Sequence, residues 1–141
     1  MIKAATTLFQ EYTDMINPSN KNKFEFIWQV QFAAGIDDND LTAKALPQYH
    51  DIAVYSDEFG GLVPTTQFIA SYPAGDKRTL ERQFYYTKYP KNESTTDTVI
   101  LGGYYIYKWF DVNAVTNTAH SDVNYSIYRL ADVTVDVCRS F

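Results

Sequence analysis

The stretch that decides the fold runs from residue 64 to residue 78 and reads Pro64-Thr65-Thr66-Gln67-Phe68-Ile69-Ala70-Ser71-Tyr72-Pro73-Ala74-Gly75-Asp76-Lys77-Arg78. Proline is tolerated in the first turn of a helix, whereas proline and glycine after the last turn stop it. Phe68, Ile69 and Tyr72 fall on one face of such a helix. The stretch therefore predicts a short helix over residues 64–72, followed by a charged turn.

Three further segments stand around this stretch. Asn20-Lys21-Asn22-Lys23 leads into Glu25-Phe26-Ile27-Trp28-Gln29-Val30-Gln31-Phe32, and the other two are Tyr104-Tyr105-Ile106-Tyr107-Lys108-Trp109-Phe110 and Tyr128-Arg129-Leu130-Ala131-Asp132-Val133. In this order, and spread over residues 8–133, the four segments resemble the SusD/RagB family of glycan-binding outer-membrane lipoproteins. Asp76-Lys77-Arg78 matches the Asp-x-Arg of that family, and a structural ion pair is its favoured interpretation.

Composition restricts the class of protein independently of the family. The 141 residues are 45% hydrophobic and 21% charged, which is typical of one soluble globular domain. The formal net charge is −5 and the basic residues are scattered, so we expect no nucleic-acid partner. No apolar run reaches the length of a membrane span. Residues 1–7 lack an apolar core and a cleavage site, so the chain itself is predicted to carry no signal peptide.

Periodicity predicts an α+β arrangement. Apolar residues recur every three or four positions over residues 3–16 and again over 123–134, which predicts helices beside the one at 64–72. Alternation predicts strands over residues 24–33, 80–88 and 103–110. A bulge or a close backbone approach is expected at Gly102-Gly103.

The alternation of apolar and polar residues over 24–33 predicts which side chains face the core. Strict alternation buries Trp28 beside Phe24, Phe26 and Phe32, and it turns Gln29 and Gln31 outward. Residues 35–63 have no clear periodicity and are predicted to form a long loop, of a length that is usually functional or mobile.

Aromatic residues are the candidate binding groups. The chain has 12 Tyr, 9 Phe and 2 Trp, and their rings suit the C–H face and hydroxyl rim of a sugar. Most of these rings are expected in the core or on strands. Because loops display contacts on a rigid scaffold, the glycan-binding candidates are Tyr49, Tyr55 and Phe59, with Tyr104 and Trp109 in reserve.

No catalytic or metal-binding pattern stands out in the sequence. Cys138 is the single cysteine, and His50 and His120 are seventy residues apart. The acids at 37–40 lack the spacing of a calcium loop, although a calcium site there stays a minor alternative. Clustered acids in a polar loop are usually solvated, so we expect no catalytic residue, no metal and no cofactor.

The resemblance implies a function as well as a fold. It implies an α+β fragment of a mainly helical, tetratricopeptide-scaffold protein that captures glycans without catalysis. Such a protein sits on the outer face of the outer membrane of a Bacteroidetes-like bacterium, is attached only through a lipid anchor outside this chain, and serves a SusC-like TonB-dependent transporter. A stand-alone β-rich carbohydrate-binding module and a fragment of a glycoside hydrolase are the alternatives. Oligosaccharide titration and product analysis separate the three.

The resemblance ends after residue 133. The family pattern continues as Leu-Leu-Met-Tyr-Ala-Glu-Ala, whereas this chain reads Thr134-Val135-Asp136-Val137-Cys138-Arg139-Ser140-Phe141. One permitted codon choice for these residues, ACT GTT GAT GTA TGC CGA AGC TTT, gives the family pattern when it is read one nucleotide later. We therefore expect a partial family domain over residues 1–133 and a frameshifted, non-family tail over residues 134–141.

Overall fold

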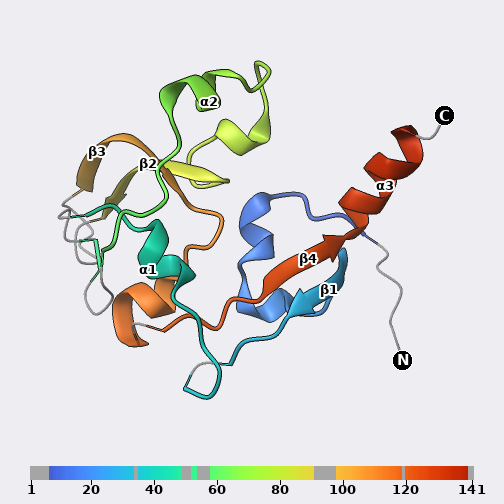
Figure 1. The fold of residues 1–141 in the computed structure, drawn as a ribbon, viewed down its shortest axis with the longest axis horizontal. Coiled ribbons are helices and arrows are strands. Elements are labelled where there is room, and N and C mark those ends of the chain that lie inside the picture. Colours follow the sequence, from blue (N-terminus) through green and yellow to red (C-terminus); the bar gives the residue numbers. More distant parts are fainter. Residues whose placement is uncertain are drawn as a thin grey trace.

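The computed structural model describes residues 7–33, 35–48, 52–53, 58–90, 98–118 and 120–139. Two separate antiparallel ribbons organise the described part (Figure 1). In the first, β1 (Phe26–Val30) pairs with β4 (Tyr125–Arg129). In the second, β2 (Tyr85–Pro90) pairs with β3 (Thr98–Ile106). Short helices surround both ribbons, so the described fold is α+β, as predicted.

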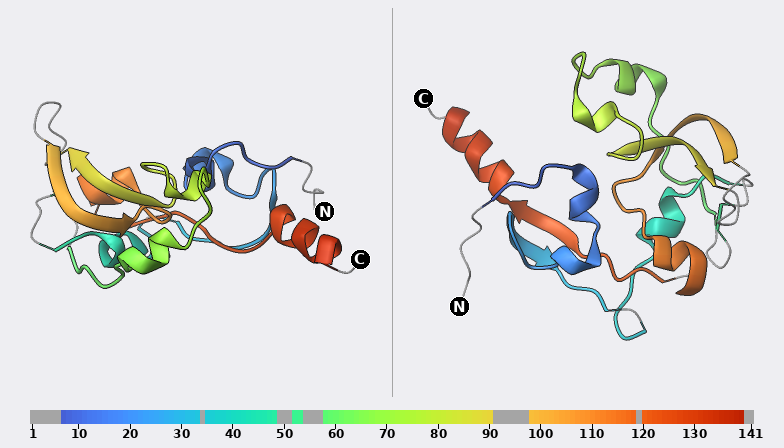
Figure 2. Two further views of the ribbon diagram at one scale, coloured as in Figure 1. Left: turned by 90° about the horizontal axis from the view of Figure 1, so that it is seen from above. Right: turned by 180° about the vertical axis from the view of Figure 1, so that it is seen from behind.

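The remaining elements are short. They are η1 (Tyr12–Met15), η2 (Pro18–Asn20), α1 (Leu41–Ala45), α2 (Thr66–Ala70), η3 (Lys77–Thr79), the π-helical turn η5 (Ala114–Thr118) and α3 (Leu130–Arg139). The molecule is flattened, and α3 leads away from one end of it (Figure 2). The β2–β3 ribbon lies with α1, α2 and η5 in one half, whereas the β1–β4 ribbon lies with η1 and η2 in the other (Figure 1).

The core sits in the half that contains β2 and β3. Its buried residues are Leu46, Ile52, Tyr86, Tyr89, Leu101, Tyr107, Phe110 and Val115. The Tyr107 and Phe110 rings stack with centroids 4.8 Å apart, and the fully buried Tyr86 ring meets both of them edge-on. Such contacts between aromatic rings add to the free energy that their burial contributes. This half therefore has a hydrophobic core of its own.

Two predictions from the sequence are confirmed, one for the helix α2 and one for the strand β3. The helix predicted at 64–72 is α2, and the Thr65 hydroxyl caps it by accepting the Phe68 N–H at 3.1 Å. The predicted bulge in β3 is also present, because Tyr86 pairs with Tyr105 whereas Lys88 pairs with Ile100. Gly102 adopts φ +71° there, a conformation that favours glycine.

The predicted long loop over residues 35–63 is only partly irregular. It contains α1, whose Thr42, Ala43 and Ala45 are buried. Leu46 and Ile52, which follow α1, belong to the core. Sequence periodicity misses this contribution because a five-residue helix completes barely more than one turn.

The helix predicted over residues 3–16 is wrong in its described part. Only Tyr12–Met15 are helical, and they form a 3₁₀ turn. The backbone N–H of Phe9 donates to the Glu25 carboxylate at 2.9 Å, and that of Tyr12 donates to Gln83 Oε1 at 2.9 Å. Because these donors bond to distant side chains, the segment is held in a non-helical conformation.

The predicted burial of Trp28 is also wrong. Trp28 is 58% exposed, whereas Gln29 is buried and its Oε1 accepts the Asn22 N–H at 2.9 Å. Gln31 is exposed as expected, and so is Phe24, which alternation had placed in the core. The β1–β4 register shifts on either side of Trp28, and each shift breaks the period-two alternation of inward and outward side chains.

The helix predicted over residues 123–134 begins late. Residues 125–129 form β4, and the helix α3 starts only at Leu130. Pairing with β1 overrides the helical periodicity of this stretch. The Asp132 carboxylate accepts the Arg129 N–H at 3.0 Å, which stabilises the first turn of α3.

Candidate functional site

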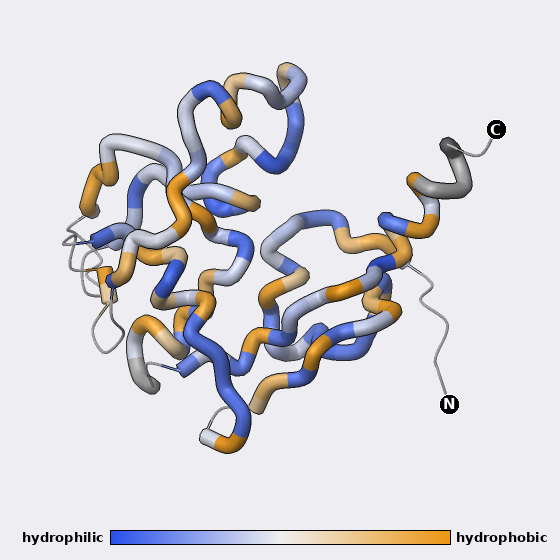
Figure 3. Tube along the Cα trace, in the orientation of Figure 1, coloured by the Kyte–Doolittle hydropathy of each residue, from blue (hydrophilic) through white to orange (hydrophobic). Residues whose placement is uncertain are grey.

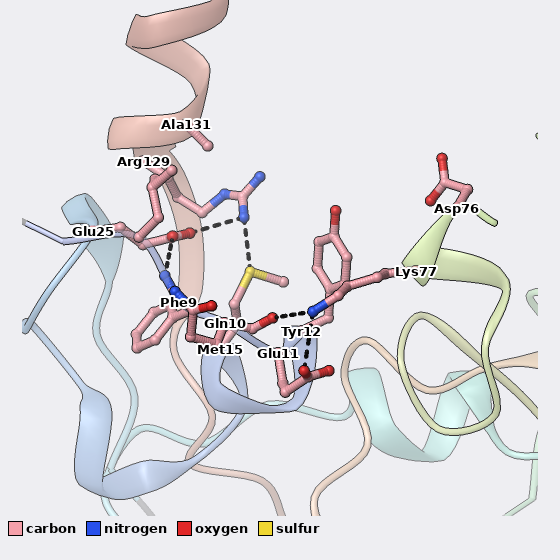
Figure 4. A pocket seen from close by; sticks show the side chains of 11 residues that line it. Phe9, Gln10, Glu11, Tyr12, Met15, Glu25, Asp76, Lys77, Arg129 and Ala131 are labelled. Atoms are coloured by element: carbon pink, nitrogen blue, oxygen red, sulfur yellow. Dashed lines mark hydrogen bonds and ion pairs between the residues drawn. The ribbon is translucent and has the colours of Figure 1, made fainter. Parts of the chain in front are cut away.

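A pocket of about 350 Å³ lies where the N-terminal segment meets β1, η3 and the β4–α3 junction (Figure 4). Its lining residues are Leu8, Phe9, Gln10, Glu11, Tyr12, Met15, Glu25, Asp76, Lys77, Arg129 and Ala131. We call it the junction pocket. The pocket is lined by aromatic rings and by charged side chains of both signs. Whether those charged groups are available to a ligand depends on the hydrogen bonds and ion pairs that they already make within the protein.

Glu25 and Arg129 form the inner wall of the junction pocket. The Glu25 side chain is almost fully buried, and its Oε1 lies 3.0 Å from Arg129 Nη1. Its Oε2 accepts the Phe9 N–H, while the Glu25 carbonyl accepts the Leu130 N–H at 2.8 Å. One residue, immediately before β1, thus holds the N-terminal segment, β4 and α3 together. Glu25 and Arg129 are 104 residues apart and no local pattern links them, so sequence reasoning missed this ion pair.

Lys77 and Asp76 form the opposite wall. Lys77 Nζ lies 3.1 Å from both the Gln10 carbonyl and the Glu11 carboxylate. The Arg78 guanidinium donates hydrogen bonds to both carboxylate oxygens of Asp76. These hydrogen bonds lower the pKa of Asp76 to about 2. The predicted structural role of the Asp76–Arg78 pair agrees with this geometry.

The charged groups of the junction pocket therefore bind one another or the backbone. A glycosidase needs a carboxylic acid with a raised pKa that faces the substrate, whereas the pKa of Asp76 is lowered. Glu25 is occupied by Arg129 and by Phe9. The arrangement is that of a brace between chain segments.

The predicted glycan-binding residues are only partly described. Tyr49 and Tyr55 lie outside the described residues. Phe59 is 50% exposed, and Tyr104 and Trp109 are half-buried. Phe59 and Trp109 are brought to the same helix, because the Phe59 N–H donates to the Ala43 carbonyl and the Thr42 hydroxyl donates to the Trp109 carbonyl. Two candidates far apart in sequence are thus anchored to consecutive residues of α1, whereas Tyr104 lies on β3.

Trp109 has two further neighbours. Its ring stacks on Tyr125 with centroids 6.4 Å apart and planes 24° apart. The Lys108 ammonium lies 5.5 Å from the Trp109 ring and 5.5 Å from the Phe84 ring. Desolvation among these groups lowers the pKa of Lys108, and the nearby positive charge of Arg129 adds to the effect. Trp109 and Tyr125 form a ring pair with a cation beside it, a mixture that suits a hydroxylated ligand.

The acidic run at 37–40 has partners within the protein. Asp40 pairs with Lys44 at 2.9 Å, and Asp38 lies 3.4 Å from His120 Nδ1. Asn39 donates to the carbonyls of Ser121 and Val123. Among the described residues, no group of three or more His, Cys, Asp or Glu side chains could hold a metal ion.

Sequence reasoning missed the most exposed aromatic pair of the described residues. Trp28 on β1 and Tyr128 on β4 are cross-strand partners, 58% and 54% exposed, and their rings stack 6.1 Å apart. Strict alternation predicted that Trp28 is buried in the core, and the periodicity around Tyr128 predicted a helix. The exposure of this pair depends on the irregular pairing of β1 with β4, and neither segment has a local sequence signal for that pairing.

The fold and these sites define an α+β protein with exposed aromatic rings and an internal ion-pair brace. In the described part, no helix is both long and apolar enough to cross a membrane. No family model matches the chain, and no curated protein matches it.

A solved structure does match it. The structure is that of a SusD superfamily protein from Parabacteroides distasonis ATCC 8503, with 43% sequence identity, a TM-score of 0.82 and coverage of 92% of this chain. The chain spans 29% of the length of that solved chain. The resemblance drawn from the four sequence segments is confirmed, and the chain is SusD-like.

Proposed function

We propose that this chain is part of a SusD-type protein that captures oligosaccharides or polysaccharides without catalysis. It acts at the outer face of the outer membrane and delivers its ligand to a SusC-like TonB-dependent transporter. The observation that carries the proposal is the match to a SusD superfamily protein, at 43% identity over 92% of this chain. A lipid anchor outside this chain supplies the membrane attachment, and nucleic acid has no role.

Binding in this proposal relies on stacking of sugar rings on exposed aromatic side chains. Phe59 and Trp109 are the described candidates next to α1, and Tyr49, Tyr55 and Tyr104 complete the set. Loss of one stacking ring is expected to weaken binding by about 1 kcal/mol. Lys108, beside Trp109, is placed to donate to sugar hydroxyls.

The proposal also concerns the extent of the chain. Residues 1–133 correspond to a partial SusD-like domain that belongs with a tetratricopeptide scaffold, and residues 134–141 form a frameshifted tail. The nucleotide sequence of the gene tests the tail. If the codons after residue 133 do not encode Leu-Leu-Met-Tyr-Ala-Glu-Ala in the next frame, the frameshift is rejected.

A chimera tests the binding function. In the solved Parabacteroides distasonis protein, the matched segment is replaced by the matching part of this chain; we call this protein the chimera. Calorimetric titration with a panel of α- and β-linked oligosaccharides is expected to show binding, and chromatography is expected to show no cleavage products. Cleavage would favour the glycoside hydrolase alternative, and absence of binding to the whole panel would contradict the proposal.

Variants of the chimera test the site. Substitution of Tyr49, Tyr55 and Phe59 together by alanine is expected to weaken binding of the oligosaccharide found in the panel. Ile100→Ala on β3, an exposed aliphatic change, is the matched control. Unchanged affinity in the triple variant would remove the 35–63 segment from the binding site.

A further inference from the structure

A small cavity lies where the loop after β3 meets the start of β4. Its volume is about 40 Å³, and Lys108, Trp109, Tyr125, Ser126 and Arg129 are among the residues that line it. We call it the lysine cavity. The loop and the strand mix hydrophilic and hydrophobic positions where they pass between the two halves of the molecule (Figure 3). Since one water molecule needs about 10–15 Å³ of such space, the cavity has room for a group of about three non-hydrogen atoms.

Lys108 brings a positive charge to the lysine cavity and has no carboxylate partner in the described part of the chain. Its ammonium lies 5.5 Å from the centre of the Phe84 ring and 5.5 Å from that of the Trp109 ring. The side chain reaches the surface, but desolvation lowers its pKa. Repulsion from Arg129 lowers this pKa further, and attraction to Asp132 offsets the repulsion only in part. A positive charge in these surroundings is stabilised by a bound anion.

Ser126 brings a second polar group to the same cavity. Its hydroxyl oxygen is buried and has no hydrogen-bond partner among the described residues. Buried polar atoms in folded proteins are almost always paired, so an unpaired one indicates an external partner. Because the Lys108 ammonium only donates hydrogen bonds, a group that pairs with both side chains has to be an acceptor. A carboxylate accepts through each of its two oxygens, and its three non-hydrogen atoms fit the volume of the cavity.

Trp109 and Tyr125 add a ring platform to the lysine cavity. Their rings stack with centroids 6.4 Å apart and planes 24° apart, and both residues line the cavity. Tyr125 is 39% exposed, so a ligand reaches this platform from solvent. The C–H face of a sugar packs on such a ring. In a uronic acid the carboxylate is attached to the sugar ring itself, so one residue of that sugar spans the platform and the cavity.

We propose that the lysine cavity binds the carboxylate of a uronic acid residue, with Lys108 and Ser126 as its donors and the Trp109–Tyr125 pair as the platform for its ring. This inference rests on the proposed function in glycan capture and adds the chemical class of the glycan, which is acidic. A neutral sugar offers only hydroxyls, which do not compensate the charge of Lys108. A tetrahedral sulfate group is larger than the planar carboxylate and exceeds the space in the cavity.

Oligosaccharides that differ only in charge test the proposal. The 141-residue chain contains every residue of the cavity, and it is titrated in a calorimeter with oligomers of galacturonic, glucuronic and mannuronic acid. Each oligouronate is compared with its methyl ester and with a neutral oligosaccharide of the same linkage. At least one oligouronate is expected to bind about tenfold or more tightly than its methyl ester, because the ester keeps the ring and loses the charge. Equal affinities of every acid and its ester would overturn the proposal.

Two variants assign the effect to the cavity. Lys108→Met keeps most of the apolar stem and removes the charge, so it is expected to weaken oligouronate binding about tenfold or more and to leave ester binding nearly unchanged. Ser126→Ala is expected to weaken oligouronate binding about threefold or more. Lys88→Met, on an exposed lysine of β2, is the matched control and is expected to retain full affinity. Equal losses from Lys108→Met and Lys88→Met would show attraction to net charge alone and would contradict the assignment. The comparison of acid with ester needs no variant, so it decides even where a variant does not fold.

The same titrations of the chimera separate this inference from the proposed function. If the chimera binds a neutral oligosaccharide as tightly as any oligouronate, the acidic ligand is rejected and glycan capture is supported. If a sulfated oligosaccharide binds more tightly than every oligouronate, the assignment of the cavity to a carboxylate is rejected. If neither acidic nor neutral oligosaccharides bind, both the inference and the proposed function are contradicted.

Discussion

The two ribbons of this molecule have the same construction and opposite surroundings. β2 and β3 enclose a buried aromatic cluster with Tyr86 at its centre, supported by α1 and η5. β1 and β4 expose Trp28 and Tyr128, and polar braces hold them to the N-terminal segment. Antiparallel pairing alone therefore does not account for stability in this chain. The β2–β3 half has its own core, whereas the two-stranded β1–β4 ribbon leaves Trp28 and Tyr128 exposed.

The largest expected effect contrasts one ring from each half. Tyr86→Ala is expected to lower the free energy of unfolding by about 3–5 kcal/mol, because it opens a cavity in the core. Trp28→Ala is expected to cost less than about 1 kcal/mol in the 141-residue chain, since the ring is already exposed. Urea unfolding measures both.

Tyr86→Phe is the control for the first contrast. The Tyr86 hydroxyl is buried and has no hydrogen-bond partner among the described residues, so its removal is expected to leave stability nearly unchanged. If Trp28→Ala cost as much as Tyr86→Ala, the distinction between the two halves would be lost.

The next effect concerns the brace beside the exposed ribbon. Glu25→Ala is expected to cost about 3 kcal/mol, because it leaves Arg129 without its buried partner and frees the Phe9 N–H. Asp132→Ala removes the 3.7 Å contact to the Arg129 guanidinium and the 3.0 Å hydrogen bond from the Arg129 N–H. Because this carboxylate is exposed, the expected cost is no more than about 1 kcal/mol. Equal costs in urea unfolding would show that Glu25 is not the main partner of Arg129.

A smaller effect tests the bulge in the β2–β3 ribbon. Gly102→Ala is expected to cost about 1 kcal/mol, because φ is +71° there while the space around the new Cβ is open. Gly103 has equally open surroundings without a positive φ, so Gly103→Ala is the matched control and is expected to be nearly neutral. Thermal unfolding of the two variants compares them. Similar melting temperatures for both would contradict the assigned conformation.

The smallest effect is a pH dependence at the junction pocket. The pKa of Asp76 is about 2 in the folded protein, below its ordinary value of 3.8, because of Arg78. The folded state thus binds this proton less readily than the unfolded state does. The stabilisation is complete above about pH 4 and is lost as pH falls toward 2. Asp76→Asn is expected to flatten the fall of the melting temperature over this range, and an unchanged slope would exclude Asp76 as a contributor.

The sequence predicted those elements whose signals are local. The helix at α2 depends on Thr65 and on the proline and glycine around it, and the β3 bulge depends on Gly102. The family resemblance also came from contiguous segments, and the solved structure confirms it.

The remaining elements depend on partners that are distant in sequence. The N-terminal helix fails because Glu25 and Gln83 take the backbone donors of Phe9 and Tyr12. Trp28 is exposed because two register shifts with β4 alter the alternation. The hydrophobic periodicity of these two segments contains no information about such distant partners. The same holds for the candidate site, because Phe59 and Trp109 lie in separate segments of the sequence and only the structure shows that both attach to α1.

Amide hydrogen exchange, followed residue by residue in the monomeric 141-residue chain, tests the contrast between the two ribbons most directly. In the 141-residue chain, the amides of β2 and β3 around Tyr86 are expected to exchange slowly, while those of β1 and β4 around Trp28 and Tyr128 exchange much faster. Equal protection of both ribbons in the monomeric 141-residue chain would contradict the account.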